Sequence, residues 1–251
     1  MDDHLVISPY TSRMVTLRFG QSGKAYYVSC DLLYNQSFIT LNDNDYDCGY
    51  TEDIGHVLVH FIYTGTYQTL VSTKRYQNTR DQMLAELQIA AEVLFASNAW
   101  NLPGLCKLAE IMIHRLCKSI KVLDAVDIID TVLLNKEKDN SEISRRSKRW
   151  LKEFLISSLQ EAFDKNDEMF QDIKLFEGLE NLELINVLSA ALFNMCYSRL
   201  QESLEREKQL KKSLAAEKKL REAEAEEAKT EESDSLSLAN LILNTSTSDT
   251  S

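Results

Sequence analysis

Turn-forming residues are scarce in this sequence. Its 251 residues include only two prolines and seven glycines, the residues that most often occupy tight turns and break helices. A fold with many strands needs many turns, so this scarcity predicts a mainly helical chain with little β structure. The hydrophobic content of 44% is sufficient for one large domain or two small ones with a buried core.

Basic charge and long apolar runs are also lacking. The formal net charge is −11, which argues against non-specific binding to nucleic acid or to anionic membranes, because both need a basic surface. Residues 1–10 show no basic region followed by an apolar run, so they do not resemble a signal peptide. No uncharged apolar stretch reaches the roughly 18 residues expected of a membrane-spanning helix.

Cysteine pairs with metal or redox spacing are absent as well. The five cysteines are scattered, their number is odd, and no CxxC occurs. A disulfide framework or a zinc cluster is therefore not expected, and the pattern favours a reducing compartment, cytoplasmic or nuclear.

What is present begins with a strand pattern after an N-terminal segment, residues 1–13. Val15, Leu17 and Phe19 alternate with polar residues, which is typical of a strand with one buried face. Gly20 to Gly23 then predicts a turn into a second strand at residues 24–28.

A short helix and two further segments are expected to follow this hairpin. Ser29 can cap the helix, with Asp31 in its first turn, where the helix dipole favours negative charge. Residues 38–41 are predicted to form a third strand, and residues 42–52 a polar, acidic loop.

Apolar residues spaced three and four apart then predict helices. On the first of them Phe61 lies in the middle of the apolar face and is expected to be buried, and Gly65 follows as a left-handed cap. Thr79 and Gln82 predict a capping box at the start of the next helix. The sequence places these helices at residues 54–63, 83–97 and 104–118, followed by a helical extension over 119–200 that a charged loop at 135–147 interrupts.

The composition changes at Gln201. Of the 32 residues from Gln201 to Glu232, 18 are charged. Counted in heptads from Leu200, only three of seven core positions are apolar, so a solvated helix with Glu–Lys pairs is favoured over a coiled coil. Ser, Thr and Asn are frequent from Ser233 to Ser251, which predicts that the tail, residues 201–251, is helical first and then disordered.

The order of these segments resembles the BTB/POZ domain, which has the Skp-like fold. The resemblance rests on the run from Tyr26 to Phe38, which contains a Ser-x-Phe element, and on the signature Tyr63, Thr64 and Gly65 at the end of a helix. The Thr-Gly-Thr-Tyr-Gln-Thr-Leu run is similar to that of fungal members. The resemblance covers residues 14–118 and implies an α+β domain, a small sheet with helical hairpins, followed by an all-α extension.

The resemblance also implies a function. BTB/POZ proteins mediate protein–protein interaction without catalysis or a cofactor, many as adaptors or scaffolds of cullin-RING ubiquitin ligases, so a cullin is an expected partner. The alternative is a nuclear regulatory factor that uses the same domain for self-association. The partner surface that the resemblance implies consists of Asp43, Asp45, Asp47, Glu52 and Asp53.

Two motifs could hold a metal. His56 and His60 are spaced as in zinc sites, but no third ligand is placed by its spacing, so a pair of surface histidines is favoured. Asp43, Asp45 and Asp47 alternate as in a calcium loop, which would also need Gly at position six and Glu at position twelve. The sequence has Cys48 and Ile54 there, which argues against calcium.

Two other motifs have a plain interpretation beside a functional one. Gly20 to Gly23 lacks the spacing and the Lys-Ser/Thr ending of a phosphate-binding loop, which favours a hairpin turn. A basic cluster consists of Arg145, Arg146, Lys148 and Arg149. It could direct nuclear import, although a solvated charge run is favoured. Because no catalytic set can be ordered from motifs, an enzyme is not expected.

Overall fold

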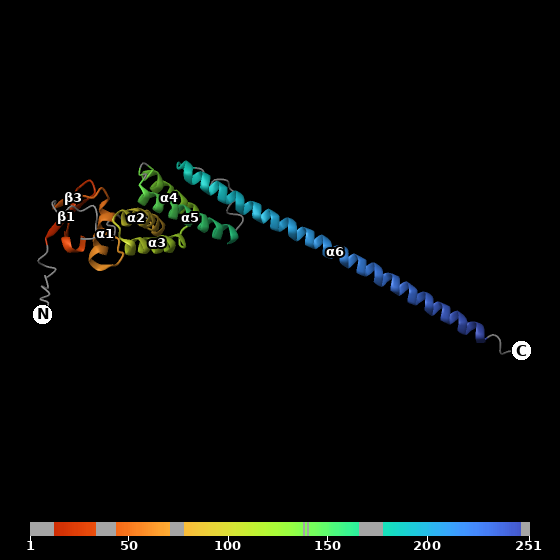
Figure 1. The fold of residues 1–251 in the computed structure, drawn as a ribbon. Helices are drawn as coiled ribbons and strands as arrows, with labels where there is room; N and C mark the ends of the chain where they lie inside the picture. Colours follow the sequence, from red (N-terminus) through yellow and green to blue (C-terminus); the bar gives the residue numbers. More distant parts are fainter. Residues whose placement is uncertain are drawn as a thin grey trace, which may run out of the picture. The chain divides into compact units, whose positions relative to one another are not determined.

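The computed structural model describes residues 13–33, 44–70, 78–137, 139, 141–165 and 178–246. The chain divides into two compact units, residues 1–191 and 192–251. The strand predicted at 38–41 and the predicted interface residue Asp43 lie outside the described residues. In chain order the elements are β1 (Met14–Phe19), β2 (Lys24–Ser29), η2 (Cys30–Leu33), β3 (Asp45–Asp47), α1 (Glu52–Thr64), α2 (Thr79–Ala99), α3 (Pro103–Cys117), α4 (Val122–Asn135), α5 (Glu142–Lys165) and α6 (Leu182–Ser246) (Figure 1).

The described chain is mixed α+β and mostly helical, as predicted, with a three-stranded sheet in the order β2-β1-β3. The β1–β2 hairpin is antiparallel, pairing Met14 with Ser29 and Phe19 with Lys24. Gly20 and Gly23 both have positive φ, and the Gly23 amide donates to the Gly20 carbonyl at 3.0 Å. The predicted hairpin turn is confirmed.

The acidic loop predicted at 42–52 contains a strand, which corrects the sequence prediction. β3 runs parallel to β1, with Thr16 opposite Asp45 and Arg18 opposite Asp47. An Asp-Tyr-Asp segment has low intrinsic strand preference. It pairs because the free edge of β1 accepts it, and because the Arg18 guanidinium donates to both carboxylate oxygens of Asp45.

Helix α1 covers the sheet but turns a slightly different face inward than predicted. Gly65 has φ 69° and its amide donates to the Phe61 carbonyl at 2.7 Å, so the predicted left-handed cap is confirmed. Phe61, however, is only half-buried, which corrects its assignment to the core. Val59 is buried instead, and the ring of Phe61 lies beside Gly104 at the start of α3.

Helix α2 is the centre of the first unit. It packs against α1, α3, α4 and α5, and residues 93–97 are buried without a break, as expected of a helix that has neighbours all round. Its N-cap is Asn78 and not Thr79, which corrects the predicted capping box. The Asn78 Oδ1 accepts a hydrogen bond from the Asp81 amide at 2.8 Å. Figure 1 shows the sheet at one end of this unit and α4 and α5 at the other.

The loop predicted at 135–147 is shorter than expected, because α5 begins at Glu142. Ser144 and Ser147 lie in its first turns and are buried. The hydroxyl of Ser147 accepts a hydrogen bond at 2.9 Å from Asn98 of α2. The end of the segment that was predicted as a charged loop is therefore packed at a contact between α2 and α5.

Helix α6 starts in the first unit at a buried carboxylate. Asp130 of α4 accepts from the amides of Glu180 and Asn181 at 3.0 and 3.1 Å. Asn181 in turn accepts from the Leu184 amide at 2.8 Å. These bonds satisfy backbone donors at the helix start that otherwise have no partner.

In the second unit α6 is a single helix, and among its described side chains only Met195 is buried. Every residue from Leu200 to Ala223 is exposed, and ion pairs one turn apart join neighbours such as Glu217 and Arg221. The predicted Glu–Lys helix is thus confirmed. The backbone stays helical to Ser246, past Ser233, where disorder was predicted. None of the helices among the described residues is both long and apolar enough to cross a membrane.

Candidate interaction site

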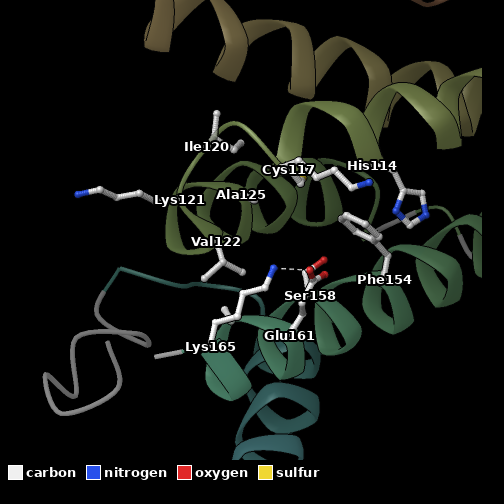
Figure 2. Close-up of a pocket in the computed structure, with 12 residues that line it drawn as sticks. His114, Cys117, Ile120, Lys121, Val122, Ala125, Phe154, Ser158, Glu161 and Lys165 are labelled. Carbon is white, nitrogen blue, oxygen red and sulfur yellow. Dashed lines mark hydrogen bonds and ion pairs between the residues drawn. The ribbon is translucent and has the colours of Figure 1, made fainter. Parts of the chain in front are cut away.

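A groove on the first unit combines an apolar floor with a charged rim. It encloses about 320 Å³ between the last turns of α3, the α3–α4 connection, the first turns of α4 and the second half of α5. Figure 2 shows Val122 of α4 facing Ser158 and Lys165 of α5 across the groove. The groove is half-open, so it can accept a side chain from another molecule. The other apolar members of its lining are Ile120, Ala125, Phe154 and Ala162.

Stacked rings close one end of the groove. His114 of α3 meets Phe154 of α5 edge-on, with ring centroids 4.7 Å apart, and Trp150 stacks on Phe154 at 5.5 Å. Such contacts between aromatic rings fix ring orientation and stabilise the α3–α5 contact. Aromatic rings therefore form one wall of the groove.

The rim is mainly basic. Lys118 and Lys121 lie on the α3–α4 connection and Lys165 at the end of α5, and all three are exposed. Lys165 pairs with Glu161 at 2.5 Å, drawn as a dashed line in Figure 2. The hydrogen bond from Lys165 lowers the pKa of Glu161, so this carboxyl stays ionised and is a poor proton donor at neutral pH.

The thiol at the groove does not suit nucleophilic chemistry. Burial raises the pKa of Cys117 to about 12. Because the thiolate is the reactive form of cysteine, a thiol with this pKa is almost fully protonated near neutral pH. Cys117 is therefore a poor nucleophile at this pH.

The acidic residues predicted as a partner surface are largely engaged within the chain. Asp45 is held by Arg18, and the hydrogen bond from that guanidinium lowers the pKa of Asp45. Asp47 accepts from the Gly49 amide at 3.1 Å, and Glu52 pairs with Lys24. Asp45 and Asp47 thus make contacts at the sheet edge, and Glu52 joins the start of α1 to β2. Asp53 lies beside Glu52 in the first turn of α1.

The signature residues also act locally. The Tyr63 hydroxyl donates to the Tyr27 carbonyl at 2.9 Å and ties the end of α1 to β2. Thr64 donates to the His60 carbonyl at 2.8 Å. With the Gly65 cap, these contacts account for the signature as the end of a helix.

The two candidate metal ligands lie together but without a third. The rings of His56 and His60 stack with centroids 5.8 Å apart, and His60 Nε2 lies 2.9 Å from the Thr66 hydroxyl. Burial lowers the pKa of His56, and the neighbouring His60 and Lys24 act in the same direction. Within the described residues, no three His, Cys, Asp or Glu side chains come together as a metal site would need.

The basic cluster lies on α5, not in a loop. Arg145 is paired with Glu142 at 3.5 Å, and Lys148 donates to the Asp139 carbonyl at 2.8 Å. Arg146 and Arg149 line a second hollow beside the α2–α3 turn. A role in nuclear import stays a prediction.

Comparison with known proteins places the chain near uncharacterised fungal proteins. A family model described as the HAC6 N-terminal domain matches residues 34–120. Two subtelomeric hrmA-associated cluster proteins, from two strains of Aspergillus fumigatus, are 25% identical over 147 residues, which is 59% of this chain. The chain spans 33% of the length of these relatives. No solved structure matches it.

The assignment to the BTB/POZ family that this resemblance implied is wrong. The family model that matches the same part of the chain is the HAC6 N-terminal domain, and no BTB/POZ family is found. The cullin partner and the acidic partner surface were implied by that resemblance alone. The groove was not foreseen, because its lining comes from three helices and shows no common spacing in the sequence.

Proposed function

We propose that this chain is a non-enzymatic protein-interaction module that binds a partner segment in the groove between α3, α4 and α5. The observation that supports this proposal most is the combination of an apolar floor with three exposed lysines on the rim. Apolar pockets surrounded by polar groups are typical of sites where a partner inserts an anchoring side chain.

The charges on the rim select the chemistry of the partner. The chain as a whole carries a net charge of −11, yet Lys118, Lys121 and Lys165 are gathered around this groove. Charge complementarity speeds association and rejects partners of the wrong sign. The partner is therefore a protein segment with an apolar anchor and acidic neighbours.

A peptide array tests this proposal with defined probes. Its peptides carry one central Leu or Phe, flanked by Asp and Glu in one set and by Lys and Arg in the other. The full chain should prefer the acidic set. A double variant, Lys118→Glu with Lys121→Glu, should lose that preference.

A matched control makes the same change of charge elsewhere. Lys107 and Arg145 are exposed and lie outside the lining of the groove, so Lys107→Glu with Arg145→Glu should keep the acidic preference. If both double variants bind like the wild type, or if the wild type shows no preference, the groove is not the binding site.

A further inference from the structure

Helix α6 carries its charges in two blocks of opposite sign. From Lys208 to Arg221 the sequence has six cations and one glutamate, a net charge of +5. From Glu222 to Asp234 it has seven acidic residues and one lysine, a net charge of −6. The backbone is one continuous helix through both blocks. The blocks therefore follow one another along a single rod, each about 20 Å long at 1.5 Å per residue.

Apolar residues lie on both sides of the charged blocks. Phe193, Tyr197, Leu200 and Leu204 are 70%, 54%, 56% and 42% exposed, and their spacing of four, three and four places them on one helix face. On the far side of the blocks, the sequence from residue 238 to 243 reads Leu-Ala-Asn-Leu-Ile-Leu. A row of large exposed apolar residues on one face is typical of an interaction surface.

We propose that two copies of this chain associate through α6 in antiparallel orientation, with the two-fold axis near Arg221 and Glu222. The basic block of each copy then lies along the acidic block of the other, and both contacts form at once. In the same register, residues 200–204 of one copy lie opposite residues 239–243 of the other. The charge pattern sets this register, and in it Leu200 and Leu204 of one copy meet the apolar segment 238–243 of the other.

The charges oppose a parallel arrangement in register. Two parallel helices in register place the +5 block against itself and the −6 block against itself, and like charges that face one another across an interface repel. Antiparallel pairing turns the same blocks into two attractive contacts. A self-complementary surface of this kind is the normal basis of a two-fold dimer.

The ion pairs within α6 do not oppose this pairing. Lys211 pairs with Glu207 at 2.6 Å and Lys218 with Glu222 at 3.9 Å. These side chains are at least 57% exposed, and exposed pairs of this kind contribute little to stability. Re-pairing with a second chain therefore requires little energy.

The energetics differ from those of a leucine-core coiled coil. Glu207, Lys211 and Lys218 occupy heptad core positions, so no continuous apolar seam exists. Electrostatic attraction between exposed charges is screened by salt. Association through α6 is consequently expected to be strong at low ionic strength and weak at high ionic strength.

Sedimentation equilibrium of the full chain tests the association. The dimer should form at 50 mM salt. Its dissociation constant should rise about tenfold or more at 500 mM, because the Debye length shortens from roughly 14 Å to roughly 4 Å and the attraction between facing charges is screened. A chain that stays monomeric at 50 mM salt, or a dimer that is indifferent to salt, would overturn the proposal.

Charge reversal identifies the blocks as the contact. One variant carries Lys211→Glu, Lys212→Glu, Lys218→Glu and Lys219→Glu, and a second carries Glu224→Lys, Glu226→Lys, Glu227→Lys and Glu231→Lys. Neither should dimerise alone, and an equimolar mixture should form a heterodimer. Circular dichroism of each variant shows whether the helix is intact. If both intact variants still form homodimers, the contact lies elsewhere.

Cysteine cross-linking determines the orientation. Cys196 is exposed, while the other cysteines are half-buried. In the antiparallel dimer the two copies of Cys196 lie about 75 Å apart along the helices, so mild oxidation should not join them. In a Thr245→Cys variant, Cys196 should instead form a disulfide with residue 245 of the other copy. A Cys196–Cys196 disulfide in the wild type would show parallel pairing and overturn the proposal.

Discussion

The ring of Phe19 lies directly against Gly55. A Cβ placed on Gly55 would come within 2.2 Å of Phe19 Cγ, and Phe19 is fully buried at the end of β1. This contact sets how closely α1 approaches the sheet. Glycine at this helical position is therefore required by packing, even though it is among the poorest helix formers.

Gly55→Ala is expected to destabilise the chain. At an ordinary helix position this change stabilises by up to about 1 kcal/mol, but overpacking of a core costs about 1–3 kcal/mol. The urea midpoint should fall. Adding Phe19→Leu should offset part of the loss, because the two residues are in contact. A Gly55→Ala variant that is more stable than the wild type would contradict the contact.

Asp130 is expected to contribute more to the stability of the chain than Asp127, which lies one helical turn away. Asp130 is buried and accepts two amides at the start of α6, so Asp130→Ala should leave buried donors without a partner and cost about 1–3 kcal/mol. Asp127 lies on the exposed side of α4, and Asp127→Ala is the matched control. Chemical denaturation of both variants measures the difference, and equal losses would contradict the role of Asp130.

Local features of this fold could be predicted, and features formed at a distance could not. The Gly65 cap and the Gly20–Gly23 turn depend on a few neighbouring residues, so their sequence pattern suffices. Strand β3 depends on Arg18, which is 27 residues away from Asp45. Ser147 is buried because Asn98 of another helix binds it. The groove also could not be predicted, because residues of three helices that are distant in the sequence form its lining.

His56 is expected to make stability depend on pH. Its pKa is lowered in the folded chain, chiefly by burial, from an ordinary value of 6.5. Just below pH 6.5 the unfolded chain therefore binds more protons than the folded one, so the free energy of unfolding rises with pH in that window. The contribution of neutral His56 to the free energy of unfolding is complete above pH 6.5 and is lost as the pH falls below that value.

The His56→Gln variant should reduce that dependence. Urea titrations between pH 5 and pH 7.5 give the slope for each chain, and the wild type should show the steeper one. A direct NMR titration of the His56 ring provides an independent measurement. A ring pKa above 6.5 would contradict the assignment of burial as the dominant cause.

Cys117 is expected to resist alkylation. With its pKa raised to about 12, only roughly one thiol in ten thousand is ionised at pH 8, and the thiolate is the reacting form. Cys196 is exposed and provides an internal comparison in the same molecule. Iodoacetamide labelling followed by peptide mass spectrometry should show fast modification of Cys196 and slow modification of Cys117. Comparable rates would reopen a nucleophilic role for the groove.

The helix beyond Leu200 is expected to be dispensable for the stability of the first unit. The buried apolar residues of that unit end at Leu188, whereas every described side chain from Gln201 to Ala223 is exposed. A chain ending at Leu200 should therefore melt within about 2 °C of the full chain, since loss of exposed residues changes stability by only a few tenths of a kcal/mol. Its circular dichroism should lose the helical signal of the removed residues. The comparison belongs at 500 mM salt, because dimerisation would otherwise raise the apparent stability of the full chain by mass action. A shortened chain without cooperative unfolding would show that α6 beyond Leu200 supports the core.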